Sequence, residues 1–284
     1  MKHFKLLAAL MAALVALTAC SALAETITIG VPNDTTNEAR ALQLLASNGI
    51  IEIAEGAGET ATKGDVISDN VEIVEAEAAM LPNLLPDLDY AVMNLNFVLQ
   101  AIDTGIEISE PLLQEDPESY MPRANVLAVH SDNVDADMTK ALVAALHSQQ
   151  VKDYIEKTYV GAVVSVVDTP TDGYDPDVDY DALAGQTVVI AATPMPHAEI
   201  LNNVVTGILA EKDITLKVEE YTDYTSENRL VDAGDAYANY FQHQPYLDQE
   251  VSENGYKVES VALIHTEPMG LYGARQSDLS ALQN

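Results

Sequence analysis

The sequence predicts an α/β protein made of two α/β segments that an acidic linker separates. Short apolar runs with strand character alternate along the chain with longer runs whose apolar residues recur at helical spacing. This alternation stops once, at residues 168–184, where turn-forming and acidic residues are crowded together. Because strands that alternate with helices favour parallel pairing, mostly parallel sheets are expected.

The first segment, residues 25–167, opens with a strand and a helix. Residues 26–31 alternate polar and apolar side chains, as a half-buried strand does. Thr35 and Glu38 then stand three residues apart at the head of an apolar-periodic run, which predicts a capping box that opens a helix. The first turn of this helix is expected at the carboxyl edge of a sheet, where open α/β sheets bind ligands. Further strands are predicted at 71–74, 90–94 and 125–130, and helices at 76–85, 138–146 and 151–159.

The linker at 168–184 carries aspartates at every second position, namely Asp175, Asp177, Asp179 and Asp181. Alternating carboxylates invite a calcium interpretation. The glycine turn and the distal glutamate of an EF-hand loop are missing, so a solvated linker is favoured. After the linker, strands are predicted at 187–191, 216–221 and 257–265, and a helix at 197–210.

Residues 1–24 are predicted to be a secretory signal peptide. Lys2 and Lys5 precede an apolar run at 6–17 that is too short to span a bilayer, and small residues follow it. Cys20, the only cysteine of the chain, ends the segment LTAC, which resembles the lipobox of bacterial lipoproteins, where the cysteine is lipidated. The alternative is cleavage after Ala24, which discards Cys20. We therefore expect an exported protein that only a lipid anchors to the cell membrane, facing the periplasm or the exterior.

The charge of the chain excludes one class of partner. The sequence has 13 Lys and Arg against 45 Asp and Glu, a net charge of −32. Binding to phosphate backbones needs clustered cations, so no nucleic-acid partner is expected. A hydrophobic content of 48% is nevertheless enough to bury a core.

A search for catalytic motifs is negative. The sequence contains no Gly-x-Ser-x-Gly elbow, no His-Glu-x-x-His zinc helix and no Gly-x-x-x-x-Gly-Lys phosphate loop, so neither an enzyme nor a cofactor is predicted. The alternative is a metal-binding or metal-dependent exported protein. It would use His197, Glu199, His243 and His265, although no two of these histidines have metal-site spacing on one helix.

Two features suggest a ligand site. Arg40 is the only arginine in the first turns of a helix that follows a clear strand. A guanidinium there is suited to hold a small carboxylate in a two-pronged contact, reinforced by the helix N-terminus, and the alternative is a surface ion pair. Residues 238–246 gather three aromatic residues and a histidine in a chain with 6% aromatic residues, which indicates either a packed corner or a binding wall for an apolar side chain.

Several segments together resemble successive signatures of the NlpA family, the methionine-binding lipoproteins of ABC importers. They are TPMPHAEIL (193–201), YTDY (221–224), ANYFQHQPY (238–246), HTEPMG (265–270), PNDTTNEARAL (32–42), AVMN (91–94) and YVGAV (159–163). In the family, the first of these lies near the mature N-terminus, and PNDTTNEARAL follows HTEPMG. The sequence is therefore similar to a circular permutant in which residues 168–184 join the usual termini. Two halves that pair with another chain would give the same order.

The resemblance implies a two-lobed fold like that of periplasmic binding proteins, with a ligand cleft between the lobes. Residues 25–122 form one lobe, to which 272–284 return, and residues 123–271 form the other. The resemblance also implies that the protein captures L-methionine or a similar small amino acid and delivers it to the permease and ATPase of an ABC importer. Closure of the lobes around the ligand would be a hinge motion.

The resemblance further implies which residues bind the ligand. Arg40 holds the α-carboxylate from one lobe, while Asn94 and Asn125 hydrogen-bond the amino and carboxylate groups. Aromatic surface suits a polarizable thioether. The side chains that enclose the methionine side chain from the other lobe are Tyr224, Phe241, His243 and Tyr246.

Overall fold

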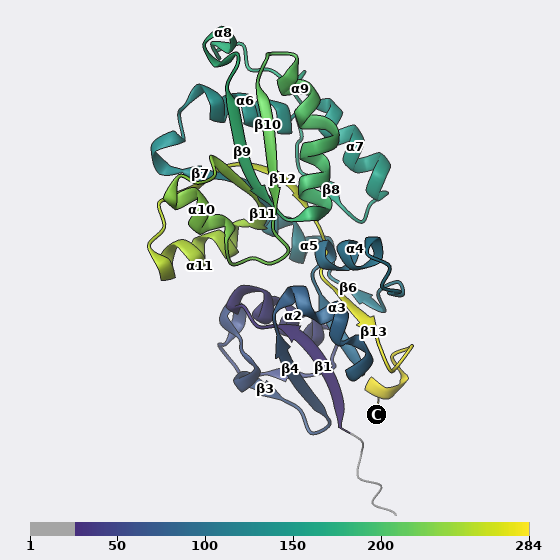
Figure 1. The fold of residues 1–284 in the computed structure, drawn as a ribbon. Coiled ribbons are helices and arrows are strands. Elements are labelled where there is room, and N and C mark those ends of the chain that lie inside the picture. The colour runs from purple at the N-terminus through teal and green to yellow at the C-terminus, as the bar shows by residue number, and fades with distance from the viewer. Residues whose placement is uncertain (1–25, 284) are drawn as a thin grey trace, which may run out of the picture.

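The structure, a computed structural model, describes residues 26–283. The predicted signal peptide, its cleavage site and Cys20 lie outside the described residues. Two mixed sheets with helices packed around them form two lobes, one below the other in Figure 1. The lobe that contains the first strand is called the first lobe, and the other the second lobe. Within residues 26–283, no helix has the length and apolar character needed to cross a membrane.

The first lobe is built on a five-stranded sheet of order β4-β1-β5-β13-β6. Its strands are β1 (Ile27–Pro32), β4 (Val71–Ala76), β5 (Tyr90–Met93), β6 (Leu113–Gln114) and β13 (Gly270–Gly273). The helices are α2 (Thr35–Ser47), α3 (Leu81–Leu84) and α4 (Leu95–Asp103), and a small separate sheet pairs β2 (Glu52–Ile53) with β3 (Val66–Ile67). Helix α2 covers one face of the sheet and buries Leu42 and Leu45 against Ile29.

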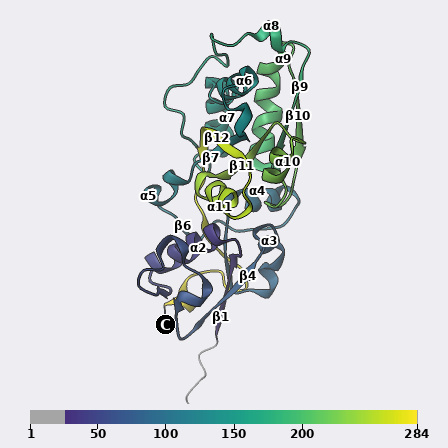
Figure 2. The same ribbon diagram turned by 90° about the vertical axis from the view of Figure 1, so that its left-hand side faces the viewer.

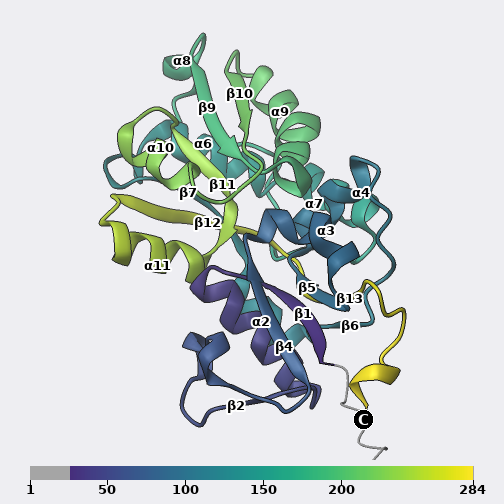
Figure 3. The same ribbon diagram turned by 60° about the horizontal axis from the view of Figure 1, so that its bottom comes forward.

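The second lobe is built on a six-stranded sheet of order β10-β9-β11-β7-β12-β8. Its strands are β7 (Asn125–His130), β8 (Val164–Ser165), β9 (Thr187–Ala192), β10 (Thr215–Glu220), β11 (Ala238–His243) and β12 (Val258–Thr266). The helices are α6 (Asp137–Leu146), α7 (Gln149–Tyr159), α8 (Tyr180–Leu183), α9 (Thr206–Ala210), α10 (Glu227–Ala233) and α11 (Gln244–Asn254). Figure 3 shows α11 of this lobe beside α2 of the first lobe, with which it is in contact.

The expectation of mostly parallel sheets is wrong. β1 pairs in parallel with β4 and β5, and β9 with β10 and β11, but β7 and β13 are antiparallel to both of their neighbours. The cause is the passage of the chain between lobes. Residues 115–124, which include the short helix α5 (Pro117–Tyr120), lead from β6 into β7, and residues 267–269 lead from β12 into β13. β7 and β13 each follow a passage from the other lobe, so they begin at the lobe boundary. Their neighbours β11 and β5 end at this boundary, and the paired strands therefore run in opposite directions.

Two helical predictions also need correction. The helix that opens at Thr35 is capped by the preceding Asp34, whose carboxylate accepts from the backbone N–H of Asn37. Glu38 instead accepts from the backbone N–H of Lys63. The helix predicted at 76–85 is broken into 3-10 turns around the four-residue α3, because Pro82 and Pro86 each remove a donor and stand at the start of a new helical segment.

The segment 168–184 is more firmly packed than the solvated linker predicted from its composition. Thr171 donates its backbone N–H to the carbonyl of His147 at 2.9 Å, and Val178 and Leu183 are buried in the core of the second lobe. The ammonium of Lys212 lies 4.4 Å from the ring centre of Tyr174. Helix α8, within this segment, lies at the end of the second lobe that is remote from the first lobe (Figures 1 and 2).

Both ends of the described chain lie in the first lobe. The hydroxyl of Tyr90, on β5, donates to the carbonyl of Asp278, and Leu279 and Leu282 pack on the same core as Ile27. Figure 2 shows the C-terminal end beside the start of β1. Neighbouring ends in one lobe, with residues 168–184 closing the other lobe, agree with the permuted order that the sequence indicates.

Candidate ligand-binding cleft

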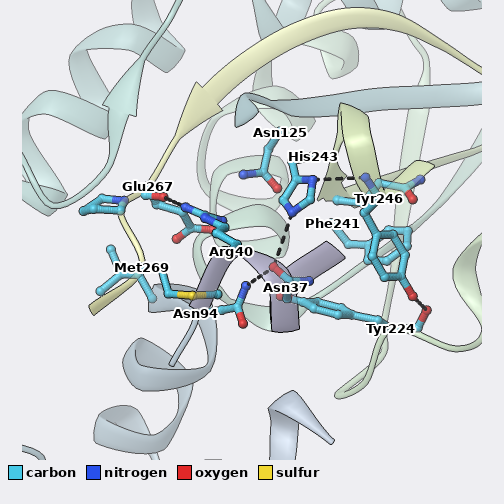
Figure 4. A pocket seen from close by; sticks show the side chains of 13 residues that line it. Asn37, Arg40, Asn94, Asn125, Tyr224, Phe241, His243, Tyr246, Glu267 and Met269 are labelled. Atoms are coloured by element: carbon cyan, nitrogen blue, oxygen red, sulfur yellow. Dashed lines mark hydrogen bonds between the residues drawn. The ribbon is translucent and has the colours of Figure 1, made fainter. Parts of the chain in front are cut away.

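A narrow cavity lies between the two lobes. Its walls include all seven side chains that the sequence predicts for the ligand site, together with six others (Figure 4). The lining residues are Asn37, Arg40, Asn94, Leu95, Asn125, Tyr224, Phe241, Gln242, His243, Tyr246, Glu267, Pro268 and Met269. The fold thus gathers side chains from separate parts of the chain around one space.

Most of these residues lie where strands meet the lobe boundary. Asn94 follows β5 directly, His243 ends β11, and Asn125 begins β7. The polar side chain of Arg40 comes from α2, the helix that follows β1. Strand ends and helix starts therefore face the boundary from both sides, as in other open α/β sheets.

A β-bulge in β11 lies at Phe241, one of the aromatic residues that line the cavity. Tyr240 pairs with Leu127 and Gln242 pairs with Val126, so Phe241 is the extra residue of the bulged strand. A bulge re-aims a side chain. Phe241 lines the cavity, whereas Tyr240 is buried in the core of the second lobe. The segment 238–246 is therefore both a packed corner and a wall of the cavity, the two alternatives that its composition left open.

The aromatic rings of the wall pack against one another. The ring centre of Tyr224 lies 5.6 Å from that of Phe241 and 5.6 Å from that of Tyr246. Tyr224 also reaches the first lobe, because its hydroxyl donates to Oδ1 of Asn96 at 2.8 Å and its ring centre lies 4.8 Å from that of Phe97. Both partners are on α4. Tyr224 therefore closes one side of the cavity by joining the lobes.

Arg40 was expected to make a two-pronged contact with a ligand, but it makes this contact with a carboxylate of the protein, that of Glu115. Nε and Nη2 of Arg40 donate to the two carboxylate oxygens of Glu115, at 2.8 and 2.6 Å, and Nη2 also donates to the carbonyl of Glu267 at 2.9 Å. Both members of the ion pair are 4% exposed. Nη1 has no acceptor among the described residues. Arg40 thus offers a ligand one nitrogen rather than a fork.

Three side-chain amides complete the polar side of the cavity. Asn37 accepts from Nδ2 of Asn94 at 2.8 Å, and Oδ1 of Asn94 is buried without a hydrogen-bond partner in the described part of the chain. Asn125 uses its Oδ1 to accept from Nε2 of His197 at 3.0 Å, and no described group pairs with its Nδ2. An unpartnered buried acceptor is costly unless a ligand or water satisfies it.

His243 is a neutral ring with a defined tautomer. Its Nδ1 accepts from the backbone N–H of Tyr246, so its Nε2 carries the proton and donates to Oδ1 of Asn37 at 3.3 Å. Burial lowers the pKa of His243 well below the usual range, and the nearby cations of Arg40 and Arg123 add to this effect. His243 therefore links the second lobe to the first as a hydrogen-bond donor.

The four residues of the metal-binding alternative do not come together. His197 and His265 lie close to each other, and their third neighbour is Glu267, with the potential ligand atoms within 4.8 Å of one another. Glu199 instead accepts from the hydroxyl of Tyr159, and His243 bonds Asn37.

Both ring nitrogens of His197 are engaged, one by Thr193 at 2.7 Å and the other by Asn125. One ring nitrogen of His265 pairs with Tyr240, so only Nε2 of His265 and the carboxyl of Glu267 remain free in this cluster. A catalytic zinc site uses three protein ligands. The cluster is therefore poorly suited to zinc.

Sequence reasoning missed several residues of the cleft. Asn37 precedes Arg40 by three positions, so it shares one face of α2 with the predicted arginine, and helical spacing alone could have identified it. Glu267 and Met269 lie inside the segment HTEPMG, which carries the resemblance. The sequence around Glu115 does not mark it as a residue of the cleft, because its partner Arg40 is 75 residues away.

A cleft enclosed by two α/β lobes and lined by polar groups from both defines the class of two-lobed substrate-binding folds. The chain belongs to the NlpA lipoprotein family, whose model matches residues 16–167 and 188–284. These two segments leave out the whole of the segment 168–184. The first match begins before Cys20.

Known relatives match parts of the chain. The methionine-binding lipoprotein MetQ of Bacillus subtilis is 44% identical over 96 residues, which is 34% of this chain and 35% of that protein. The D-methionine-binding lipoprotein MetQ of Escherichia coli is 35% identical over 114 residues, 39% and 41% of the two chains. A lipoprotein structure from Ruminococcus gnavus is 43% identical and covers 51% of this chain and 60% of its own, with a TM-score of 0.45. The chain spans between about one third and one half of the length of the curated relatives it matches.

Proposed function

We propose that this protein is an extracytoplasmic substrate-binding protein that captures L-methionine or a similar small amino acid and delivers it to an ABC permease. The observation that carries the proposal is the division of the cavity into two chemically different ends. A cationic nitrogen of Arg40 and an unpartnered oxygen of Asn94 lie on the polar side, and aromatic rings form the other side. A zwitterion with an apolar side chain matches both ends.

The carboxylate of the ligand would bind at Arg40 and Asn125. Nη1 of Arg40 and Nδ2 of Asn125 are donors that no described group accepts from, and both residues line the cavity. Glu115 holds the guanidinium in place, so a ligand would meet a donor that is already oriented. Charge-assisted hydrogen bonds to a carboxylate are among the stronger ones.

The ammonium group would bind at Asn94. Its Oδ1 can only accept hydrogen bonds, and it is buried without a partner in the described structure. Asn37 fixes the orientation of the amide by accepting from Nδ2. The oxygen is thus pre-oriented for an N–H donor of the ligand.

The side chain of the ligand would lie against Tyr224, Phe241 and Tyr246. Their ring centres are 5.6 to 6.0 Å apart, so they form one continuous apolar surface. A thioether is polarizable and interacts favourably with aromatic rings. This wall and the names of the relatives, which are methionine-binding and D-methionine-binding lipoproteins, both support methionine.

Delivery to a permease and attachment through a lipid at Cys20 belong to the same proposal. Their support is membership of a lipoprotein family, whose match includes position 20. The protein would act by binding and release, with the lobes closing because the ligand contacts both of them.

Isothermal titration calorimetry on the purified protein tests the proposal. We expect L-methionine to bind with a Kd that is micromolar or tighter, and Phe241→Ala to weaken this binding at least tenfold. The exposed Arg229→Ala on α10 serves as the control and is expected to bind as the wild type does. If no amino acid releases or absorbs heat while zinc does, the proposal is wrong and the metal-binding alternative is favoured.

A further inference from the structure

Glu267 is a buried acid that has no role in the function proposed above. It lies in the short connection between β12 and β13, is 8% exposed and lines the cavity. Its backbone carbonyl accepts from Arg40, but Oε2 of its side chain has no hydrogen-bond partner among residues 26–283. Nε2 of His265 lies 4.0 Å from Oε1, which is beyond hydrogen-bond length.

The groups that face Glu267 do not supply it with a cation of its own. Arg40, on α2, is already paired with Glu115 through two hydrogen bonds. His265, on β12, is a buried ring whose pKa burial lowers to about 3, so it is neutral. Burial, together with the charge of Glu267, raises the pKa of the hydroxyls of Tyr224, Tyr240 and Tyr272.

Without a cation, the carboxyl group keeps its proton. Burial raises the pKa of Glu267 to about 8, although the charge of Arg40 acts in the opposite direction. At neutral pH the empty cleft therefore contains a mostly protonated carboxyl group. A cationic ligand atom beside it would favour the ionised form.

We propose that Glu267 is a further ligand-binding residue that receives the α-ammonium group of the ligand as an ionised carboxylate. This inference rests on the proposed function. On binding, the O–H bond of the Glu267 carboxyl breaks, its proton passes to the solvent, and the ligand ammonium keeps all of its protons. The carboxylate and Oδ1 of Asn94 then accept from the ammonium, so the cleft selects for an α-amino group as well as for a carboxylate.

Selection for the α-amino group of the ligand is tested with two ligands and one isosteric variant of Glu267. The ligands are L-methionine and its des-amino analogue 4-(methylthio)butanoate, which keeps the carboxylate and the thioether. Hydrogen bonds to charged groups contribute about 1.5 to 3 kcal/mol, which is about 10- to 150-fold in affinity. Glu267→Gln is expected to weaken methionine binding by at least tenfold and to leave the affinity for the analogue within about threefold.

The matched control is Glu227→Gln. Glu227 is a second buried glutamate, on α10, whose pKa burial also raises to about 8, but it does not line the cavity. This variant is expected to keep the wild-type ratio of the two affinities. Binding of the analogue by Glu267→Gln shows that the cleft has folded. If Glu267→Gln keeps the wild-type ratio, the inference is wrong.

Proton release gives an independent measurement. Titrations of methionine at pH 7 in buffers of different ionisation enthalpy should show the release of close to one proton per ligand bound in the wild type. Glu267→Gln should release none, and the release in the wild type should disappear at pH 9, where the empty protein has already ionised Glu267. Zero release at pH 7 in a wild type that binds methionine overturns the inference while leaving the proposed function intact. A wild type that binds no amino acid overturns the proposed function itself, and the inference with it.

Discussion

Arg40 and Glu115 form a buried ion pair at the junction of the two lobes. Nη2 of Arg40 lies 2.6 Å from Oε2 of Glu115, and the same oxygen accepts from the backbone N–H of Met269 at 2.7 Å. Glu115 begins one of the two connections between the lobes, and Met269 lies in the other. The pair therefore ties both connections to α2, the helix that carries the predicted carboxylate site.

The first prediction concerns this pair. Arg40→Ala leaves the charge of Glu115 buried and unpaired, so we expect the free energy of unfolding to fall by about 3 to 5 kcal/mol, measured by urea denaturation. The double variant Arg40→Met, Glu115→Leu removes both charges and should recover most of that stability without recovering methionine binding. A loss below about 1 kcal/mol in Arg40→Ala would contradict the buried pair.

The second prediction concerns the contact of Tyr224 with the other lobe. Tyr224→Phe removes the hydroxyl that donates to Asn96 but keeps the ring against Phe97. One hydrogen bond contributes about 0.5 to 1.5 kcal/mol, so methionine affinity should fall about two- to tenfold in calorimetry. Tyr221→Phe is the matched control, because among residues 26–283 the hydroxyl of Tyr221 bonds only Glu219, within the second lobe. Equal losses in both variants would argue against an interlobe role for Tyr224.

The third prediction concerns pH and Glu227. Its Oε1 has no hydrogen-bond partner among the described residues, and burial raises its pKa from 4.5 to about 8. Between these two values the unfolded chain loses the proton and the folded chain keeps it. The contribution of protonated Glu227 to the free energy of unfolding is thus fully present below about pH 4.5 and is lost as the pH rises to about 8.

Urea denaturation between pH 5 and 8 measures this loss. The free energy of unfolding of the wild type should fall with rising pH, and the fall should be smaller in Glu227→Gln by an amount on the order of a few kcal/mol. Glu253→Gln replaces an exposed glutamate of α11 and is the control. An identical pH profile for the wild type and Glu227→Gln would refute the buried, protonated carboxyl.

The fourth prediction concerns the chain order. A chain that runs from 185 to 283, continues through a short flexible linker and ends with residues 26–167 restores the order usual in the family. Because both described ends lie in the first lobe, we expect it to fold as a monomer and to bind methionine with a Kd within about threefold of the wild type. It lacks the packing of Val178 and Leu183, so its free energy of unfolding should fall by about 2 to 5 kcal/mol. An obligate dimer in gel filtration would indicate exchanged halves instead.

Much of the fold could be predicted from local patterns. The strand predicted at 125–130 is β7, and that at 187–191 lacks only the last residue of β9, because short apolar runs between turn formers define buried strands. Strand direction was predicted wrongly. The direction of β7 and β13 depends on where the chain passes between lobes, and no short segment of sequence records that passage. The break in the helix predicted at 76–85 does have a local signal, which is Pro82.

The grouping of the candidate site residues could be predicted from the sequence, but their contacts with other residues could not. All seven side chains that the resemblance indicates line one cavity, and their role in ligand binding stays a prediction. The partner of Arg40 was not predictable, because Glu115 is distant in sequence and lies in an irregular connection. The packed state of residues 168–184 was missed for a related reason. Composition records their charge, whereas Val178 and Leu183 are buried by contacts with distant helices.

The bulge at Phe241 has a consequence for how the ligand range of such a cleft can change. As the extra residue of β11, Phe241 has no partner opposite it on β7, so exchanging its side chain disturbs no cross-strand pair. Arg40, in contrast, cannot be exchanged without disturbing the connections between the lobes. Natural variation is therefore expected to alter the preferred side chain of the ligand at Phe241 while the recognition of its carboxylate stays constant.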